Sequence, residues 1–342
     1  MKRAPETSLS LTKKAKPDAT GNALIRTVKR TSSLSAPIMQ LTGHEQEVFS
    51  VSFSPDGQLV ASASMDRHIF LWNTFGDCSN FSLLKGHQGA VLETCWGRDN
   101  QTLYSCSADM SVAIWSSESS QRLRKLRGHT NFVNAIAASR SGGQEMIASV
   151  SDDNTCRVWD PREKNAISVI ENQYQLTAVT WAASSPTVFT GGIDNTIRGW
   201  DLRNTDEPIY ALEGHADTIS GLRASPDGTS LLSNSFDNTL KLWDIRPFAA
   251  GGERLIRTLQ GAPQGFEKNL IRPCFSADGD FIACGSADRS VVVWYGDRIV
   301  YKLPGHKGCV NHVDWHPVEP VIASCSSDRT ILLGELDVSE VK

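Results

Sequence analysis

The sequence lacks long apolar runs and closely spaced metal ligands. No segment approaches the roughly 20 apolar residues that a membrane-spanning helix needs, and the N-terminal residues contain no apolar stretch of signal-peptide length. The eight cysteines are scattered and none forms a Cys-x-x-Cys pair, whereas zinc sites need clustered ligands. We therefore expect reduced thiols, no metal or other cofactor and no membrane partner.

The motifs that bind nucleotides or activate water are also missing. The chain contains no Gly-x-x-x-x-Gly-Lys-Ser/Thr loop, no His-Glu-x-x-His pair and no dinucleotide-binding glycine pattern. We therefore expect neither an enzyme nor a small-molecule substrate.

Charge is distributed unevenly along the chain. Residues 1–35 hold eight basic side chains against two acidic ones, a net charge of +6, and the whole chain has −4, so the remainder carries −10. The first segment is rich in Ser, Thr, Lys and Pro and poor in large apolar groups, so residues 1–35 should form a disordered basic tail. The clusters at 13–16 and 29–30 fit a nuclear-import signal or an RNA-contacting arm, with a merely solubilising tail as the alternative. The acidic body is a poor binder of phosphate.

A repeat runs through the rest of the chain. The dipeptide Gly-His recurs at 43–44, 86–87, 128–129, 214–215 and 305–306. The two longer gaps are about twice the shorter ones, so one unit in each has lost its Gly-His. In six units an Asp precedes a Trp by six positions, while the seventh has Asp328 but Gly334 in place of Trp. Seven units of about 40–45 residues predict seven propeller blades, and the pattern resembles the WD-repeat family.

Each unit has the pattern of four short antiparallel strands. Residues 49–53 alternate in polarity, Ser-Pro-Asp-Gly at 54–57 forms a turn, and residues 59–62 run back. We therefore expect an all-β protein, a seven-bladed WD-repeat β-propeller over residues 36–338, followed by a short C-terminal end at 339–342.

The ends of the repeat region predict how the ring closes. A strand at 37–42 precedes the first repeat, whereas the last unit lacks an outer strand. Residues 37–42 should therefore pair with the last blade and leave no open interface between blades. Deleting residues 1–42 should then destabilise the fold, whereas deleting residues 1–34 should not.

Four units contain a complete set of Ser, His, Asp and Trp. These tetrads are Ser62/His44/Asp66/Trp72, Ser105/His87/Asp109/Trp115, Ser149/His129/Asp153/Trp159 and Ser233/His215/Asp237/Trp243. The same residue types form hydrolase triads. The family resemblance implies instead a buried hydrogen-bonded chain from Trp through Ser and His to Asp, which fixes blade geometry. A nucleophile repeated around a ring, with no Gly-x-Ser-x-Gly elbow, does not indicate an active site, so we expect no catalytic residues.

Departures from the repeat predict the interaction surface. The fourth unit has Glu-Asn-Gln-Tyr at 171–174 where Gly-His would stand, and irregular connections lie at 246–252 and 265–270. Residues just before each turn Asp should lie where the central channel opens. The candidate partner-binding residues are Met65, Tyr174, Phe236, Phe248 and Phe266. Packing within the core or a loop is the alternative for each of them.

Features outside the repeat resemble the WD-repeat subunits of the U5 small nuclear ribonucleoprotein of the spliceosome. They include Ala-Pro-Ile-Met at 36–39, Gly-Gly-Ile-Asp-Asn at 191–195 and Tyr-Lys-Leu-Pro-Gly-His at 301–306, and the resemblance covers roughly residues 36–336. It implies a non-enzymatic scaffold in the nucleus that mediates protein–protein contacts in pre-mRNA splicing. The implied partners are the large spliceosomal scaffold protein, the GTPase and the RNA helicase of that particle, with RNA contacted indirectly or through the tail.

Three other functions are alternatives. Trp-Asp-x-Arg at 159–162, 200–203 and 243–246 matches a pattern with which substrate receptors of cullin-type ubiquitin ligases bind their adaptor. A hydrolase that used a tetrad would lose its activity on Ser105→Ala substitution. A chromatin reader that used the channel face would bind a histone-tail peptide.

Overall fold

The computed structural model describes residues 30–140, 143–183, 185–247 and 253–338. The chain divides into Met1–Arg30 and Thr31–Lys342, and the fold described below concerns the second unit. Most of the expected disordered tail, the candidate Phe248 and the C-terminal end at 339–342 lie outside the described residues. No helix within the described ranges has the length and apolar character needed to cross a bilayer.

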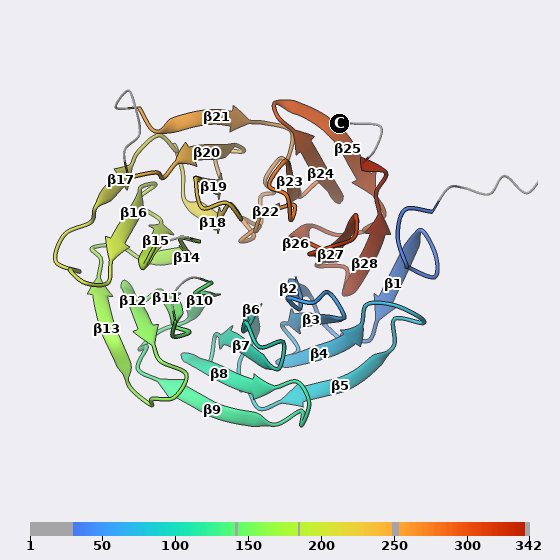
Figure 1. Ribbon diagram of the computed structural model, residues 1–342, viewed down its shortest axis with the longest axis horizontal. Helices are drawn as coiled ribbons and strands as arrows, with labels where there is room; N and C mark the ends of the chain where they lie inside the picture. The colour runs from blue at the N-terminus through green and yellow to red at the C-terminus, as the bar shows by residue number, and fades with distance from the viewer. Residues whose placement is uncertain (1–29, 141–142, 184, 248–252, 339–342) are drawn as a thin grey trace, which may run out of the picture. The chain divides into compact units, whose positions relative to one another are not determined.

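Seven four-stranded antiparallel sheets form blades around a central channel, which confirms the predicted seven-bladed propeller (Figure 1). In blades 1 to 6 the strand that comes first in the chain lies innermost, and in blade 7 the innermost strand is β26. Blades 1 to 4 consist of β2 (Val48–Phe53), β3 (Leu59–Ser64), β4 (His68–Asn73) and β5 (Asn80–Lys85); β6 (Val91–Trp96), β7 (Thr102–Ser107), β8 (Ser111–Ser116) and β9 (Arg122–Arg127); β10 (Val133–Ala138), β11 (Ile147–Ser151), β12 (Thr155–Trp159) and β13 (Ala166–Glu171); and β14 (Leu176–Trp181), β15 (Thr187–Gly192), β16 (Ile197–Asp201) and β17 (Tyr210–Leu212).

Blades 5 to 7 follow the same order, except that the last blade takes its outer strand from the start of the chain. They consist of β18 (Ile219–Ala224), β19 (Ser230–Ser235), β20 (Leu240–Asp244) and β21 (Leu255–Leu259); β22 (Cys274–Phe275), β23 (Phe281–Gly285), β24 (Ser290–Tyr295) and β25 (Arg298–Pro304); and β26 (Val310–Trp315), β27 (Val321–Ser326), β28 (Thr330–Glu335) and β1 (Ile38–Thr42). Strand β1 pairs antiparallel with β28, with Ile38 opposite Gly334 and Thr42 opposite Thr330. The ring is therefore closed by a sheet that contains both ends of the repeat region.

Residues 31–35, called the N-terminal anchor below, differ from the expected tail because they contact the propeller. Leu34 is only 4% exposed and packs in an apolar cluster with residues of blades 7 and 1, among them Phe53 and Val321. The boundary expected after residue 35 is therefore too late, since a single leucine in a polar segment finds a buried position. Deleting residues 1–34 removes this contact, so we no longer expect that deletion to be without effect on stability.

The core lies between neighbouring blades. Inner strands are covered on both faces, as in β14 and β26, where every residue is buried; β14 consists of apolar residues and threonine, whereas β26 also buries Asn311, His312 and Asp314. Outer strands alternate, as in β5, because only one of their faces packs on the next blade. A register shift in front of the tryptophan recurs where the third strand meets the fourth, as between Leu71 and Trp72.

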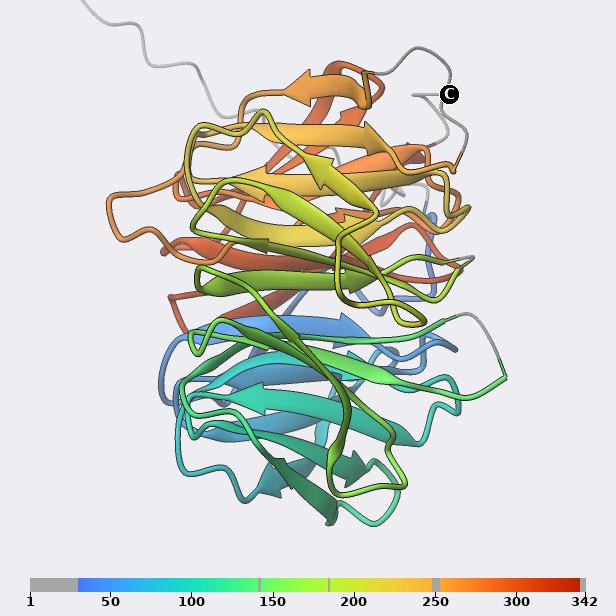
Figure 2. The same ribbon diagram turned by 90° about the vertical axis from the view of Figure 1, so that its left-hand side faces the viewer.

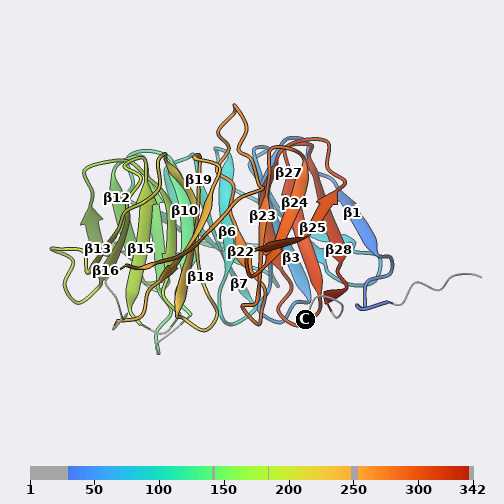
Figure 3. The ribbon, with the colours of Figure 1, turned by 90° about the horizontal axis from the view of Figure 1, so that it is seen from above.

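The two ends of the ring carry different loops. Because consecutive strands are antiparallel, the loop entering each innermost strand and the loop between the second and third strands lie at the same end. A backbone bond from Met65 N–H to Glu47 O, at 2.9 Å, joins the two loops of blade 1. We call this end the Asp-turn face, since it carries the tetrad aspartates, and the other end the opposite face. The β21–β22 connection rises above the other loops of the Asp-turn face (Figures 2 and 3).

Candidate interaction surface

Each tetrad is a continuous hydrogen-bonded chain that ties one blade together. In blade 1, Trp72 Nε1–H donates to Ser62 Oγ at 2.9 Å, and His44 Nε2 lies 2.8 Å from the same hydroxyl. His44 Nδ1 lies 2.8 Å from Asp66 Oδ2. The same contacts occur in blades 2, 3 and 5, between Trp115, Ser105, His87 and Asp109, between Trp159, Ser149, His129 and Asp153, and between Trp243, Ser233, His215 and Asp237.

The donors and acceptors of a tetrad fit together in one way. An indole N–H can only donate, so the serine oxygen accepts from the tryptophan and its own hydrogen points to histidine Nε2. Histidine Nδ1–H then donates to the aspartate. Ser62, Ser105, Ser149 and Ser233 are completely buried. A hydroxyl that is buried and bonded on both sides cannot approach a substrate, so the geometry favours a structural role for the tetrads over nucleophilic catalysis.

The pKa values of the tetrad aspartates are lower than that of a free aspartate side chain. Burial acts to raise the pKa of Asp66, but hydrogen bonds from His44 and from the backbone N–H groups of Glu45 and His68 outweigh it, and the pKa is lowered. The same balance lowers the pKa values of Asp109, Asp153 and Asp237. Burial lowers the pKa of His215 despite its aspartate partner. In blade 5 the folded state therefore favours an ionised Asp237 beside a neutral His215.

Three blades keep only part of the tetrad. Blade 7 retains the contacts of His306 with Ser324 and Asp328, at 2.9 and 3.1 Å, but has Gly334 where a tryptophan would stand. In blade 4, Trp200 Nε1–H donates to Thr190 Oγ1 at 2.9 Å. In blade 6, Trp294 Nε1–H donates to the carbonyl of Gln260 at 3.2 Å, since Cys284 replaces the hydroxyl residue.

The Asp-turn face exposes several apolar side chains. Of the residues predicted from the sequence, Met65, Tyr174 and Phe266 are exposed on the β3–β4, β13–β14 and β21–β22 connections, and Phe266 is completely uncovered. Phe236, on the β19–β20 turn, is only half-buried. Three further exposed apolar residues lie on this face, namely Met110, Phe132 and Ile193. Ile193 precedes its turn aspartate, so its place at this face was expected although it was not among the candidate contact residues, whereas nothing in the sequence singled out Met110, which follows its aspartate, or Phe132.

Met110 has an unfavourable backbone conformation for its residue type, and its apolar side chain is exposed to solvent. Its φ angle is 64°, in the left-handed region that suits Gly or Asn, and its side chain is 44% exposed. The equivalent turns have Asn154, Asn195 and Asn238 in blades 3, 4 and 5 and Arg67, Arg289 and Arg329 in blades 1, 6 and 7, so Met110 is the one apolar residue at this position of the seven turns. An exposed apolar side chain in a strained position does not help folding, so contact with another molecule is a better explanation for it.

The mouth of the channel on the Asp-turn face holds a small pocket of about 200 Å³. It is lined by Phe49, Leu92, Lys268, Asn269, Leu270, Arg272 and Asn311. Lys268 Nζ lies 3.1 Å from Asp217 Oδ2 and 5.4 Å from the centroid of the Phe236 ring. The β21–β22 connection is thereby fastened to blade 5, and one side of Phe236 is covered by a cation.

The channel is crossed below this pocket by an ion pair that sequence reasoning missed. Arg272, next to β22 of blade 6, places Nε 2.9 Å from Glu93 Oε1 of blade 2 and donates from Nη2 to the carbonyl of Asn134 of blade 3 at 2.7 Å. Glu93 also accepts from the backbone N–H of Ile136 at 2.8 Å. Burial raises the pKa of Glu93, against the attraction of Arg272. The only signal in the sequence is a charged residue within an otherwise apolar inner strand.

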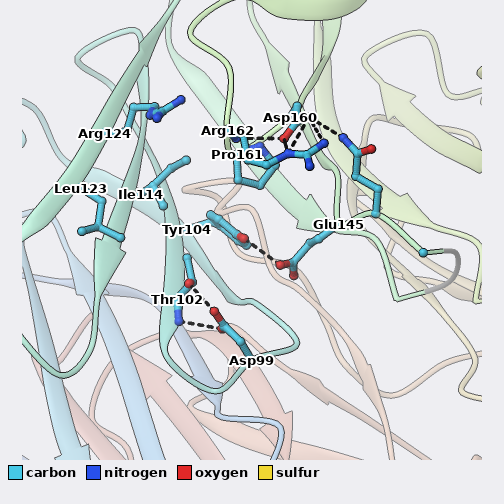
Figure 4. Close-up of a pocket in the computed structure, with 12 residues that line it drawn as sticks. Asp99, Thr102, Tyr104, Ile114, Leu123, Arg124, Glu145, Asp160, Pro161 and Arg162 are labelled. Atoms are coloured by element: carbon cyan, nitrogen blue, oxygen red, sulfur yellow. Dashed lines mark hydrogen bonds and ion pairs between the residues drawn. The ribbon is translucent and has the colours of Figure 1, made fainter.

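A groove of about 730 Å³ lies at the opposite face, between blades 2 and 3 (Figure 4). It is lined by Asp99, Thr102, Tyr104, Ile114, Leu123, Arg124, Gly143, Gln144, Glu145, Asp160, Pro161 and Arg162. Its carboxylates bond to its own walls, for example Glu145 Oε2 to the Tyr104 hydroxyl at 3.0 Å. Within the described ranges no group of three or more His, Cys, Asp or Glu side chains is arranged to hold a metal ion.

The three Trp-Asp-x-Arg motifs have a local role at the opposite face. Arg203 donates from Nε and Nη2 to the two carboxylate oxygens of Asp201, at 3.0 and 2.6 Å. Arg162 and Arg246 hold Asp160 and Asp244 in the same way. Each arginine thus closes the turn between the third and fourth strands of its blade. This local ion pair accounts for the Trp-Asp-x-Arg pattern, so the pattern by itself does not indicate binding to a ubiquitin-ligase adaptor.

All seven units match one protein-family model. It is described as WD domain, G-beta repeat, and it covers residues 35–73, 78–116, 120–160, 166–201, 206–244, 255–295 and 297–333. The chain therefore belongs to the WD-repeat family of β-propellers.

Particular members of that family are similar over nearly the whole chain. The U5 small nuclear ribonucleoprotein 40 kDa protein of Homo sapiens is 49% identical over 93% of this chain and 89% of its own length. The protein of the same name from Dictyostelium discoideum is 46% identical over 92% and 89%. The pre-mRNA-splicing factor cwf17 of Schizosaccharomyces pombe is 46% identical over 91% of both chains. The resemblance to U5 subunits that the sequence indicated is confirmed.

Proposed function

We propose that this protein is a non-enzymatic scaffold subunit of the spliceosome, within the U5 small nuclear ribonucleoprotein, and that it mediates protein–protein contacts in pre-mRNA splicing. The observation that carries the proposal is the identity of 46% or more, over about nine tenths of both chains, to proteins with these names. The propeller alone would not indicate it, since one fold serves many functions.

The chemistry of the chain supports a scaffold without catalytic activity. The repeated nucleophile–base–acid sets of the described residues are the tetrads, whose serine hydroxyls are buried and bonded to tryptophan and histidine. A scaffold needs no cofactor and no small-molecule substrate, and none is proposed.

The proposed partners are the large spliceosomal scaffold protein, the GTPase and the RNA helicase of the U5 particle, and the proposed location is the nucleus. An acidic body favours attachment to proteins over attachment to RNA phosphates. RNA contact would therefore be indirect or made by the basic residues 1–30.

The Asp-turn face is the proposed docking surface for a protein partner. It combines the exposed apolar residues with the raised β21–β22 connection, which carries Phe266. Interfaces derive most of their free energy from a few large side chains that become buried, and Met and Phe are among the enriched types. The proposed contact residues are Met65, Met110, Phe132, Tyr174, Ile193, Phe236 and Phe266.

Affinity purification tests the function. The tagged full-length chain is recovered from nuclear extract at moderate salt, with and without nuclease, and the bound proteins and RNAs are identified. We expect U5 RNA together with the large scaffold protein, and we expect the protein to remain bound after nuclease treatment. Recovery of a cullin adaptor or of histones in their place would overturn the proposal.

Paired variants test the surface. Met110→Asn with Phe266→Ser removes two apolar side chains from the Asp-turn face, and the asparagine suits the left-handed turn. Ile167→Ser, on the exposed outer strand β13, is the matched control. We expect recovery of the large scaffold protein to fall at least about tenfold for the double variant only. Equal recovery from both variants would rule out the Asp-turn face as the docking surface.

A further inference from the structure

The N-terminal anchor is held to blade 7 by hydroxyl–carboxylate bonds. Thr31 Oγ1 and Ser32 Oγ donate to the two carboxylate oxygens of Glu335, at 2.9 and 3.0 Å. Ser33 donates both its backbone N–H and its hydroxyl to Glu319, at 2.7 Å each. Three consecutive hydroxyl residues are therefore bound by two carboxylates, and each hydroxyl acts as the donor.

The other end of the anchor is attached to blade 1. Leu34 forms a parallel bridge with Gly76, and Ser35 Oγ donates to the carbonyl of Gly76 at 2.7 Å. The Leu34 side chain is buried in the apolar cluster at the boundary of blades 7 and 1. The anchor thus contacts both blades that meet where the ring closes, with the hydroxyl–carboxylate bonds to blade 7 on one side of Leu34 and the contacts with Gly76 of blade 1 on the other.

We propose that Ser33 is a phosphorylation site and that its modification releases the N-terminal anchor. Lys29 and Arg30 precede it, at four and three positions on its N-terminal side, so a Ser/Thr kinase directed by basic residues fits this sequence. The kinase transfers the γ-phosphoryl group of ATP. The bond from that phosphorus to the bridging oxygen of ADP breaks, a bond to Ser33 Oγ forms, and the hydroxyl proton passes to the base of the kinase.

Ser33 is one of the two anchor hydroxyls that solvent reaches easily. Ser33 and Ser35 are exposed, whereas Thr31 and Ser32 are half-buried, and of the two exposed serines only Ser33 has a basic residue three positions before it. A kinase requires an extended segment, so it modifies the anchor while the anchor is transiently open, and the phosphate then keeps it open.

Electrostatics explains why the modified anchor does not return. A phosphoserine carries a charge of about −1.5 to −2 and no hydroxyl hydrogen. At residue 33 it loses the bond to Glu319 and brings like charges within a few ångströms of each other, next to the second carboxylate of Glu335. Repulsion of this kind shifts the balance of open and closed anchor by roughly tenfold or more.

Proteolysis of the full-length chain tests the release. Phosphoserine is incorporated at position 33 during translation, and chymotryptic cleavage after Leu34 is followed by mass spectrometry against the unmodified chain. Leu34 is buried while the anchor is closed, so we expect cleavage about tenfold faster with the phosphate. In a Glu319→Gln background the acceleration should shrink to a few-fold at most. An unchanged rate, or an equal acceleration in both backgrounds, would overturn the mechanism.

Direct phosphorylation tests the assignment to Ser33. The folded full-length chain is incubated with labelled ATP and the catalytic domain of an arginine-directed Ser/Thr kinase. We expect label in the peptide that contains residue 33 and its loss in Ser33→Ala. Labelling that persists in Ser33→Ala, or a lack of label in this peptide, would contradict the assignment.

Discussion

At the scale of single residues, the serine at the centre of each tetrad connects the most groups. Ser149 Oγ accepts from Trp159 at 2.8 Å and lies 2.8 Å from His129 Nε2, which in turn holds Asp153. Removing this oxygen leaves an indole N–H and an imidazole nitrogen buried without partners. Such loss is costly because neither group regains the hydrogen bonds that it would make to water.

Replacing this serine should cost more in a complete tetrad than in an incomplete one. We expect Ser149→Ala to lower the free energy of unfolding by about 2–3 kcal/mol, because two buried groups lose a partner. The matched control is Ser324→Ala in blade 7, where Gly334 replaces the tryptophan and only His306 loses a partner, so about half the cost is expected. Urea denaturation of both variants measures the difference. Equal losses would mean that the tryptophan bond contributes nothing.

Spacing in the sequence can group residues that share a tetrad because the Ser, Asp and Trp positions recur at the same separations, four and six residues, in blades 1, 2, 3 and 5. It cannot find the acceptor of Trp294, which is the carbonyl of Gln260, since a backbone oxygen has no residue type. The sequence also could not predict the burial of Leu34, because an isolated apolar residue has no periodic pattern and its burial depends on the surface that it meets.

At the scale of elements, the weakest innermost strand is β22, which has only two residues. Arg272 lies just before β22 and adds a backbone contact with the neighbouring blade 7, because its N–H donates to the carbonyl of Asn311 at 3.0 Å. Its side chain then reaches across the channel to Glu93 and to the carbonyl of Asn134. A short strand is thus fastened to the far side of the ring by one side chain.

Breaking this ion pair should cost more than removing it entirely. We expect Arg272→Met to lower the free energy of unfolding by about 3–5 kcal/mol, since the carboxylate of Glu93 remains buried without its partner. Adding Glu93→Gln removes the unpaired charge and keeps an acceptor for Ile136 N–H, so most of the loss should be recovered. Thermal or urea denaturation of the two variants provides the measurement. A double variant as unstable as Arg272→Met would show that packing of the arginine stem, and not the charge, is what matters.

The sequence could predict the elements themselves but not this connection. Alternating and apolar runs of five or six residues, separated by Gly- and Asp-containing turns, predict the strands of most blades. Arg272 and Asn134 are 138 positions apart and become neighbours only when seven blades close into a ring. A contact of this kind depends on the diameter of the channel, and no local pattern contains that information.

At the scale of the whole molecule, four buried histidines, in blades 5 and 7, have pKa values that are lowered by burial. Burial lowers the pKa values of His215 and His306, and lowers that of His312 further. Burial also lowers the pKa of His316, and the geometry agrees with a neutral ring, since its Nδ1 accepts backbone N–H bonds from Val318 and Glu319, at 3.1 and 2.8 Å. A protonated imidazole has no acceptor, so each of these bonds requires the neutral form.

Acidification should therefore destabilise the propeller before its carboxylates titrate. The folded pKa values of these histidines lie below the ordinary value of 6.5, so as the pH falls below 6.5 the unfolded chain binds protons that the folded chain does not. The free energy of unfolding should fall by roughly 1.4 kcal/mol per pH unit for each such histidine. A second loss of the same sign should follow below pH 3.8, because the pKa values of aspartates such as Asp66 are lowered in the folded state. Urea denaturation at closely spaced pH values between 8 and 4 measures the slope. The variant His316→Asn keeps an acceptor for Glu319 N–H but has no titrating ring. In this variant the slope of the free energy of unfolding against pH, between pH 6.5 and 5, should decrease by up to about 1.4 kcal/mol per pH unit, which corresponds to one proton. A free energy of unfolding that stays constant from pH 8 to 5 would mean that the histidines are protonated in the folded ring, against the acceptor roles that the geometry gives them.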